Sequence, residues 1–297
     1  MRVFVTGATG FIGSAIVPEL INAGHQVLGM ARSDAGAQSL IAAGAEVHRG
    51  DLEDLESLRT GAVKSDAVIH TAFMHDFFLK FQENCEIDRR AIEALGDSLA
   101  GSDRPLIVTS GLALLASGRI ATENDPPVPV SSSYPRASEA SAASLASRGV
   151  RTLIVRLPQV HDTVKQGLVT FAIRLAREKG VSAYIGEGSK RWAAAHRLDV
   201  AHLYGLALEK GEASARYHAV AEEGVPFRDI AEAIGRGLNV PVVSIAPEEA
   251  AGHFGWLAAF AGLDLQASSA QTRAKLGWNP IGPTLLTDLE KMRYFQT

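Results

Sequence analysis

The chain has 297 residues, of which 46% are hydrophobic, and a formal net charge of −4 at pH 7. This length suits one large α/β domain, alone or with a small cap, and the mild acidity without a basic tract excludes a nucleic-acid-binding surface. The lone Cys85 cannot form an internal disulfide, no Cys/His spacing suggests a zinc site, and no apolar run is long enough for a signal peptide or a membrane span. We therefore expect a cytoplasmic protein without a metal site.

A glycine-rich turn follows the first apolar run, which predicts a strand over Val3–Thr6. The turn reads Thr6-Gly7-Ala8-Thr9-Gly10-Phe11-Ile12-Gly13. Gly7 permits a tight turn, Gly10 lets a diphosphate approach the backbone, and Gly13 lets the next helix pack closely on the strand. The turn thus predicts a dinucleotide site at the N-terminus of that helix. The residues assigned to this site are Gly7, Thr9, Gly10, Phe11, Ile12 and Gly13.

Further short apolar runs alternate with helical patterns through the first half of the chain. The runs are apolar on both faces, as in the buried strands of a parallel sheet. They predict strands over Gln26–Met30, Glu46–Arg49, Ala67–His70, Leu106–Thr109 and Thr152–Arg156. The helical patterns between them include Asp88–Leu99 and Pro135–Arg148. Such alternation requires right-handed βαβ units, so the predicted fold class is α/β with a doubly wound parallel sheet.

The end of the second predicted strand favours NADP(H) over NAD. Proteins selective for NAD usually place a carboxylate there, which binds the adenosine ribose hydroxyls. This chain has Arg32 and Ser33 instead, and both can hold a 2′-phosphate by charge and hydrogen bond. The alternatives are that Arg32 is a solvated surface side chain and that Asp34 reaches the ribose.

The ends of the third and fourth strands are assigned to the same cofactor. Asp51 can accept from the adenine amino group and Leu52 can cover the ring, although Asp51 could instead cap the helix that follows. Thr71, Ala72 and Phe73 end the fourth strand, at the crevice where such sheets bind ligands.

The sequence changes in character after Pro158, where Gly and Pro are frequent and helical patterns are interrupted. Arg216–Val220 reads as a last strand that returns to the main sheet. The second domain is therefore expected to be smaller and discontinuous. The predicted division is a cofactor-binding domain of residues 1–159 plus about 196–220, and a substrate-binding cap of about 160–195 and 221–297.

The chain resembles the short-chain dehydrogenase/reductase superfamily, in its extended or atypical branch of NAD-dependent epimerase/dehydratase-like proteins. Besides the glycine turn, the matching segments are Asp51-Leu52, His70-Thr71-Ala72, Val108-Thr109-Ser110, Tyr134, Val155-Arg156-Leu157-Pro158, His196-Arg197-Leu198-Asp199-Val200-Ala201 and Lys275-Leu276-Gly277-Trp278-Asn279-Pro280. The resemblance covers essentially the whole chain. It implies a Rossmann sheet, adds Tyr134 and Pro158 to the cofactor contacts, and implies a homodimer through the helices around Asp88–Leu99 and Pro135–Arg148.

The resemblance also implies a catalytic tyrosine, with a lysine four residues later that lowers the tyrosine pKa. Tyr134 matches the tyrosine, and Pro135 behind it predicts a helix start. Four residues on stands Ser138, which a helix would place on the same face as Tyr134 and which could keep a ribose hydrogen bond. Arg136, two positions away, is expected to project elsewhere.

The family's catalytic serine follows the fifth main strand and hydrogen-bonds the substrate oxygen. Here it falls at Ser110 or one place later, at Gly111. If Gly111 is the equivalent position, Thr109 or Ser110 can substitute or the role is lost. Our catalytic assignment is Tyr134, Ser110 and Ser138.

The substrate side is predicted from an aromatic stretch, residues 73–81, which is either part of the cap interface or the wall of an apolar pocket. Within it, Phe77 is a candidate wall residue and His75 is an alternative proton donor. His161 stands where the family often has a pocket tyrosine. Trp192 is a further pocket candidate, and Lys165 and Arg197 are others without decisive support.

Together these features predict an NADP(H)-dependent oxidoreductase that reduces the carbonyl of a small, fairly apolar ketone or aldehyde. Tyr134 would supply the proton. One alternative is a catalytically weak or inactive protein that senses NADP(H). Another is an epimerase or dehydratase of the same superfamily.

Overall fold

The computed structural model describes residues 1–74, 80–116 and 118–292. Within them, seven parallel strands form the main sheet, in the order β10-β6-β5-β4-β1-β2-β3. The strands are β1 (Arg2–Thr6), β2 (Gln26–Ala31), β3 (Glu46–Arg49), β4 (Ala67–His70), β5 (Leu106–Gly111), β6 (Thr152–Leu157) and β10 (Arg216–His218). The strand order reverses between β1 and β4, which creates a crevice at the carboxyl ends of these two strands. The predicted fold is confirmed, including the return of the chain to the sheet at β10.

Helices cover both faces of this sheet because successive strand side chains point to opposite sides. Val3 and Val5 face the core that includes α1 and α7, whereas Phe4 faces the core that includes α3, α4 and α5. The first group consists of α1 (Gly13–Asn22), α2 (Asp34–Ala42), α7 (Arg197–Lys210) and α11 (Ala270–Leu276). The second consists of α3 (Leu55–Val63), α4 (Phe81–Asp97) and α5 (Ser138–Ser147). None of the helices among the described residues is long and apolar enough to cross a membrane.

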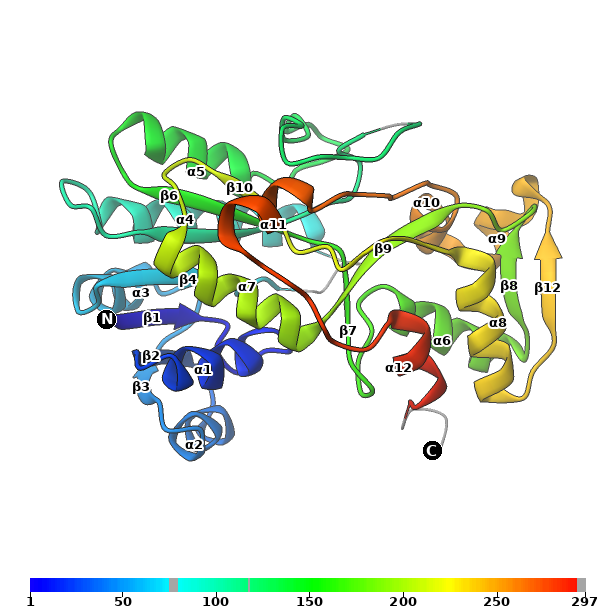
Figure 1. Cartoon of the computed structure of the whole chain (residues 1–297), viewed down its shortest axis with the longest axis horizontal. Coiled ribbons are helices and arrows are strands. Elements are labelled where there is room, and N and C mark those ends of the chain that lie inside the picture. The colour runs from blue at the N-terminus through cyan, green and yellow to red at the C-terminus, as the bar shows by residue number, and fades with distance from the viewer. Residues whose placement is uncertain (75–79, 117, 293–297) are drawn as a thin grey trace.

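The C-terminal part of the chain builds a second core, to the right of the main sheet in Figure 1. It contains a sheet of β7 (Gln159–His161), β9 (Arg191–His196) and β11 (Glu222–Pro226), and a strand pair of β8 (Ser182–Ile185) and β12 (Val242–Ile245). Its helices are α6 (Val169–Lys179), α8 (Phe227–Leu238), α9 (Ala250–Phe254), α10 (Ala258–Ala261) and α12 (Leu285–Glu290), with short 3-10 turns at Pro247–Glu249 and Gly255–Leu257. Strands β7 and β9 connect this part to the main sheet (Figure 1).

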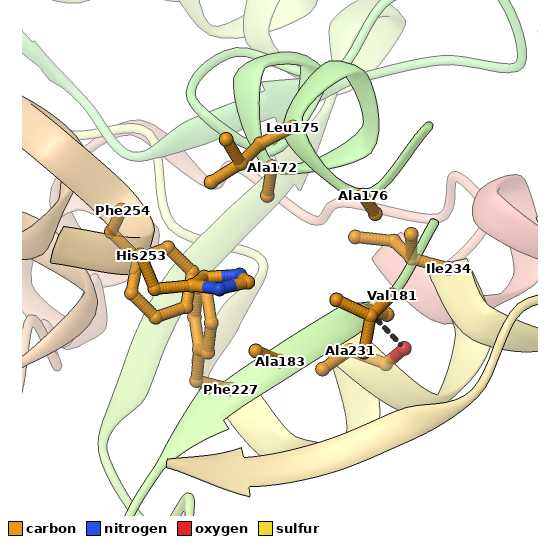
Figure 2. A pocket seen from close by; sticks show the side chains of 11 residues that line it. Ala172, Leu175, Ala176, Val181, Ala183, Phe227, Ala231, Ile234, His253 and Phe254 are labelled. Carbon is orange, nitrogen blue, oxygen red and sulfur yellow. Dashed lines mark hydrogen bonds between the residues drawn. The ribbon is translucent and has the colours of Figure 1, made fainter. Parts of the chain in front are cut away.

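This second core contains a small cavity between α6, α8, α9 and β8 (Figure 2). Its wall is apolar apart from His253 and Ser182. The Ser182 hydroxyl donates to the Ala231 carbonyl at 2.8 Å, and burial lowers the pKa of His253. Because this cavity presents no pair of polar groups to a ligand, we locate the candidate site elsewhere.

Candidate functional site

The glycine turn joins β1 to α1 at the crevice and leaves no room for side chains. Gly7 has φ +69°, and a Cβ there would lie 2.7 Å from the Ala72 nitrogen. A Cβ on Gly13 would lie 2.1 Å from the Gly7 carbonyl oxygen. Gly10 donates its N–H to that same oxygen at 2.8 Å and is exposed, as is Thr9.

Two basic side chains from the C-terminal half reach this turn at Phe11. Arg197, at the start of α7, donates to the Phe11 carbonyl at 3.3 Å, and its guanidinium lies 5.2 Å from the centre of the Phe11 ring. The Lys165 ammonium lies 5.7 Å from the same ring. Arg197 also pairs with Asp162 at 3.3 Å. Both cations thus lie beside a turn that is suited to an anion. The sequence alone did not predict where these two side chains lie.

The end of β2 presents Arg32 and Ser33 at the surface, directly before α2. The Ser33 hydroxyl caps that helix by accepting the Gly36 N–H at 3.1 Å. Asp34 forms an ion pair with Arg49. Among the described residues Arg32 has no ion-pair partner, so the arginine is free to meet a ligand while the neighbouring acid is engaged.

The other predicted cofactor residues lie along the same edge of the sheet. Asp51 accepts the N–H groups of Glu53 and Asp54 at 2.8 and 3.1 Å, whereas Asp54 is the residue that caps α3. Leu52 is buried in the core. The Thr71 hydroxyl donates to the Thr6 carbonyl at 2.8 Å and so ties β4 to β1. The remaining residues, which are half-buried, are Ala72, Phe73 and Pro158.

A small cavity lies where β5 ends, and it collects the predicted catalytic hydroxyls. Ser110 lines it, whereas the preceding Thr109 points to the other side of β5, where its hydroxyl lies 2.7 Å from the His70 carbonyl and 2.6 Å from the Tyr204 hydroxyl. Gly111 lines the cavity too, and a Cβ there would meet open space. Of the two candidate hydroxyls, Thr109 and Ser110, only Ser110 is thus among the described residues that line the cavity. Its apolar wall is made by Leu115, Pro127, Val128 and Val130.

Tyr134 lines the same cavity but does not begin a helix. Helix α5 starts at Ser138, so the predicted helical pairing of Tyr134 with Ser138 is wrong. The physical reason is that Pro135 disfavours helical backbone in the residue before it. Burial raises the pKa of Tyr134 above its usual value, and Arg136 opposes this rise. The Tyr134 hydroxyl has no hydrogen-bond partner in the described part of the chain.

Ser138 also lines this cavity but is buried, with 1% of its surface exposed. Its hydroxyl donates to Asp88 at 2.6 Å and accepts from Arg136 Nε at 3.1 Å. Asp88 in turn lies 3.1 Å from His70 Nε2, and His70 Nδ1 lies 2.8 Å from the Thr6 hydroxyl. The Ser138 hydroxyl therefore takes part in a buried network that runs back to the glycine turn, and its ribose contact stays a prediction.

Arg136 was expected to project elsewhere, and that expectation is wrong. It lines the same cavity as Tyr134, with its guanidinium 4.6 Å from the centre of the Phe73 ring. No carboxylate pairs with it among the described residues. The signal that could have revealed this arrangement is again Pro135, because an i, i+4 relation holds only inside a helix.

The wall behind Tyr134 contains a buried ion pair. Arg156 on β6 donates to both carboxylate oxygens of Glu139 on α5, at 2.9 and 2.8 Å. His218 on β10 lies beside this pair, with Nδ1 2.8 Å from the Ser268 carbonyl and Nε2 3.3 Å from Arg156 Nη1. This geometry requires a neutral ring that donates from Nδ1 and accepts at Nε2.

We expect the protein to lose stability in acid through His218. Burial lowers the pKa of its ring to about 4. The negative charge of Glu123 opposes this shift, and the positive charge of Arg156 adds to it. The unfolded chain takes up this proton near pH 6.5, so the stability contribution is present above that pH and is lost on the order of 3 kcal/mol between pH 6.5 and 4. Urea unfolding across this range measures the loss. His218→Gln should flatten the dependence.

The predicted substrate-pocket residues fall into two groups. His75 and Phe77 lie outside the described residues. Trp192 is a core side chain, not a pocket residue: it is fully buried, 4.9 Å from the Phe227 ring, and donates its indole N–H to the Phe260 carbonyl at 3.3 Å.

His161 is fully buried as well, so the structure gives it no open pocket surface. Its Nδ1 lies 2.7 Å from Asp288, and its Nε2 has no hydrogen-bond partner in the described part of the chain. Burial lowers its pKa, against the raising effect of Asp288. His161 thus joins β7 to α12.

Comparisons with known proteins agree with this fold. A sequence model described as the NAD dependent epimerase/dehydratase family matches residues 3–221. An uncharacterized protein of Schizosaccharomyces pombe is 49% identical over 99% of this chain and 100% of its own length. DesIV, a dTDP-glucose 4,6-dehydratase from Streptomyces venezuelae solved with NAD, has a TM-score of 0.77 at 19% identity and covers 99% of this chain and 96% of its own. The NAD complex of a Thermus thermophilus UDP-glucose 4-epimerase has a TM-score of 0.75 at 22% identity and covers 100% of this chain and 99% of its own.

Proposed function

The chain belongs to the NAD dependent epimerase/dehydratase family, and on this premise we propose that it is an NADP(H)-dependent oxidoreductase. Its substrate is the carbonyl group of a small, fairly apolar ketone or aldehyde, and Tyr134 is its proton donor. The observation that carries the proposal is the cavity at the end of β5. That cavity combines the hydroxyls of Tyr134 and Ser110 with an apolar wall, beside the edge that holds the glycine turn.

The residues present fit a dinucleotide. The turn can pack this closely against β4 and α1 only because Gly7 and Gly13 lack a Cβ, and Gly10 is left exposed for a diphosphate to approach. Arg197 and Lys165 bring positive charge to the same turn, and Arg32 with Ser33 supports a 2′-phosphate at the far end. A bound nicotinamide dinucleotide supplies the hydride for carbonyl reduction.

Tyr134 and Ser110 are suited to hold one carbonyl oxygen between them. Both hydroxyls lack a hydrogen-bond partner in the described part of the chain, so each can donate to that oxygen. Because burial raises the pKa of Tyr134, its phenol stays protonated at neutral pH and can act as an acid. A neutral phenol favours reduction over oxidation, in which the phenolate must accept a proton.

The proposal is tested by following NADPH consumption with a panel of small ketones and aldehydes, with NADH as the comparison. We expect alcohol product in equal amount to the NADPH consumed, and faster turnover with NADPH. Tight NADPH binding without turnover across the panel would instead favour a sensing protein. Retained cofactor with an isomerised or dehydrated sugar nucleotide and no net reduction would favour an epimerase or dehydratase.

We expect Arg32→Ala to weaken NADPH binding by about 10- to 100-fold and to leave NADH binding nearly unchanged. The reason is that a charge-assisted hydrogen bond to the 2′-phosphate contributes roughly 1.5–3 kcal/mol, and NADH lacks that phosphate. Fluorescence titration of both nucleotides measures the two affinities. The control is Arg59→Ala, which removes an exposed arginine that pairs with Glu56 on α3. Equal loss for both nucleotides would contradict the assignment.

A further inference from the structure

Arg136 brings a positive charge next to Ser138, which has no charge of its own. Arg136 Nε donates to the hydroxyl of Ser138, the very residue that stands at the lysine position, and the guanidinium lines the cavity that contains Tyr134. We infer that Arg136 is the cation of this site and that its charge, in the cavity that Tyr134 also lines, polarises the Tyr134 hydroxyl for proton transfer. This inference rests on the proposed function of Tyr134.

The guanidinium is held in place by contacts on several sides. Its carbon lies 4.6 Å from the centre of the Phe73 ring, and Nη2 lies 3.5 Å from the Thr109 carbonyl. Ser138 can accept from Nε because its own proton is donated to Asp88 at 2.6 Å. Asp88 is fixed by His70, at 3.1 Å. These partners give Arg136 a defined orientation without neutralising it by direct contact with a carboxylate.

Among the charged groups near Tyr134, Arg136 has the largest effect on the pKa of its hydroxyl. Glu139 on α5 and Arg156 on β6 pair with each other, so their effects on Tyr134 oppose. The Cys85 thiol on α4 is neutral, because burial raises its pKa to about 11. Arg136 lowers the pKa of Tyr134, second in size to the raising effect of burial. A cation in this position has the effect that a lysine would have there.

The test is an ultraviolet titration of Tyr134, taken as the difference between a protein and the same protein with Tyr134→Phe. Arg136→Gln should move the titration to higher pH by about one unit, and Arg136→Lys should retain most of the original position. Arg174→Gln is the matched control, because Arg174 also lies over an aromatic ring, 5.8 Å from Phe171, but in the second core. The same titration midpoint in all variants would overturn the inference.

This readout needs no turnover, so it separates the inference from the proposed function. A shift in the titration without reductase activity would retain Arg136 as the cation and reject the reaction. Ser138→Ala provides a second variant if Arg136→Gln does not fold. It removes the hydroxyl that orients Arg136 and should shift the titration in the same direction by less.

Kinetics of alcohol oxidation with NADP⁺ give an independent arm. In that direction the Tyr134 phenolate would take the substrate hydroxyl proton, and bound NADP⁺ would accept the hydride from carbon. Arg136→Gln should therefore lower kcat about tenfold near neutral pH and move the rising limb of the pH profile upward by about one unit, with KM little changed. A large rise in KM with an unmoved pH profile would instead make Arg136 a substrate-binding residue and overturn the inference.

Discussion

Gly13→Ala is expected to abolish measurable NADP(H) binding at micromolar nucleotide and to lower the melting temperature. The added Cβ would lie 2.1 Å from the Gly7 carbonyl oxygen and 2.7 Å from the Gly7 carbonyl carbon. Because both atoms belong to the backbone of the turn, the turn itself must move. Overpacking of this kind costs about 1–3 kcal/mol or more, and the shifted turn also loses its diphosphate contacts. Fluorescence titration with NADPH and a thermal melt measure the two effects.

The control for this substitution is Gly252→Ala. Gly252 lies in α9, its φ is not in the left-handed region, and a Cβ there would meet nothing within 4 Å. The control should bind NADPH normally and gain up to about 1 kcal/mol of stability from better helix propensity. Unchanged NADPH affinity in Gly13→Ala would show that the turn is structural only and would remove the basis for a cofactor.

The glycine turn and the main sheet could be predicted because their rules are local. Val3, Phe4 and Val5 are apolar on both faces, so the run reads as a buried strand, and the glycines after it require positive φ or close packing whatever the rest of the chain does. The strand Ala67–His70 was predicted with its observed ends for the same reason.

The contacts around the site could not be predicted because they join distant segments. Arg197 reaches Phe11 across 186 positions of sequence, and His161 meets Asp288 across 127. Trp192 looks like a pocket residue until the packing of Phe227 against it is known. At Pro135 two local rules conflict, since proline suits a first helical turn but disfavours helix in the residue before it. The structure follows the second rule: α5 begins only at Ser138, and Arg136 lines the cavity together with Ser138.

Tyr134→Phe is expected to reduce the rate of carbonyl reduction by about 10²- to 10⁴-fold, the usual contribution of a positioned general acid. The ring is retained and only an oxygen without a hydrogen-bond partner in the described part of the chain is lost, so neither NADPH affinity nor stability should change much. The matched control is Tyr184→Phe on β8, in the second core, which should keep full activity. Steady-state kinetics with NADPH and the best carbonyl substrate measure the loss.

The pH dependence adds a second criterion for the same substitution. Burial raises the pKa of Tyr134, so the acid form that reduction needs persists through neutral and mildly alkaline pH and is lost only above its usual value near 10. The wild-type reduction rate should therefore be flat over that range and fall at higher pH, while Tyr134→Phe should lack this alkaline fall. If Tyr134→Phe retained wild-type turnover and the same alkaline fall, another group would be the acid. The cavity would then bind its substrate without supplying the proton from Tyr134.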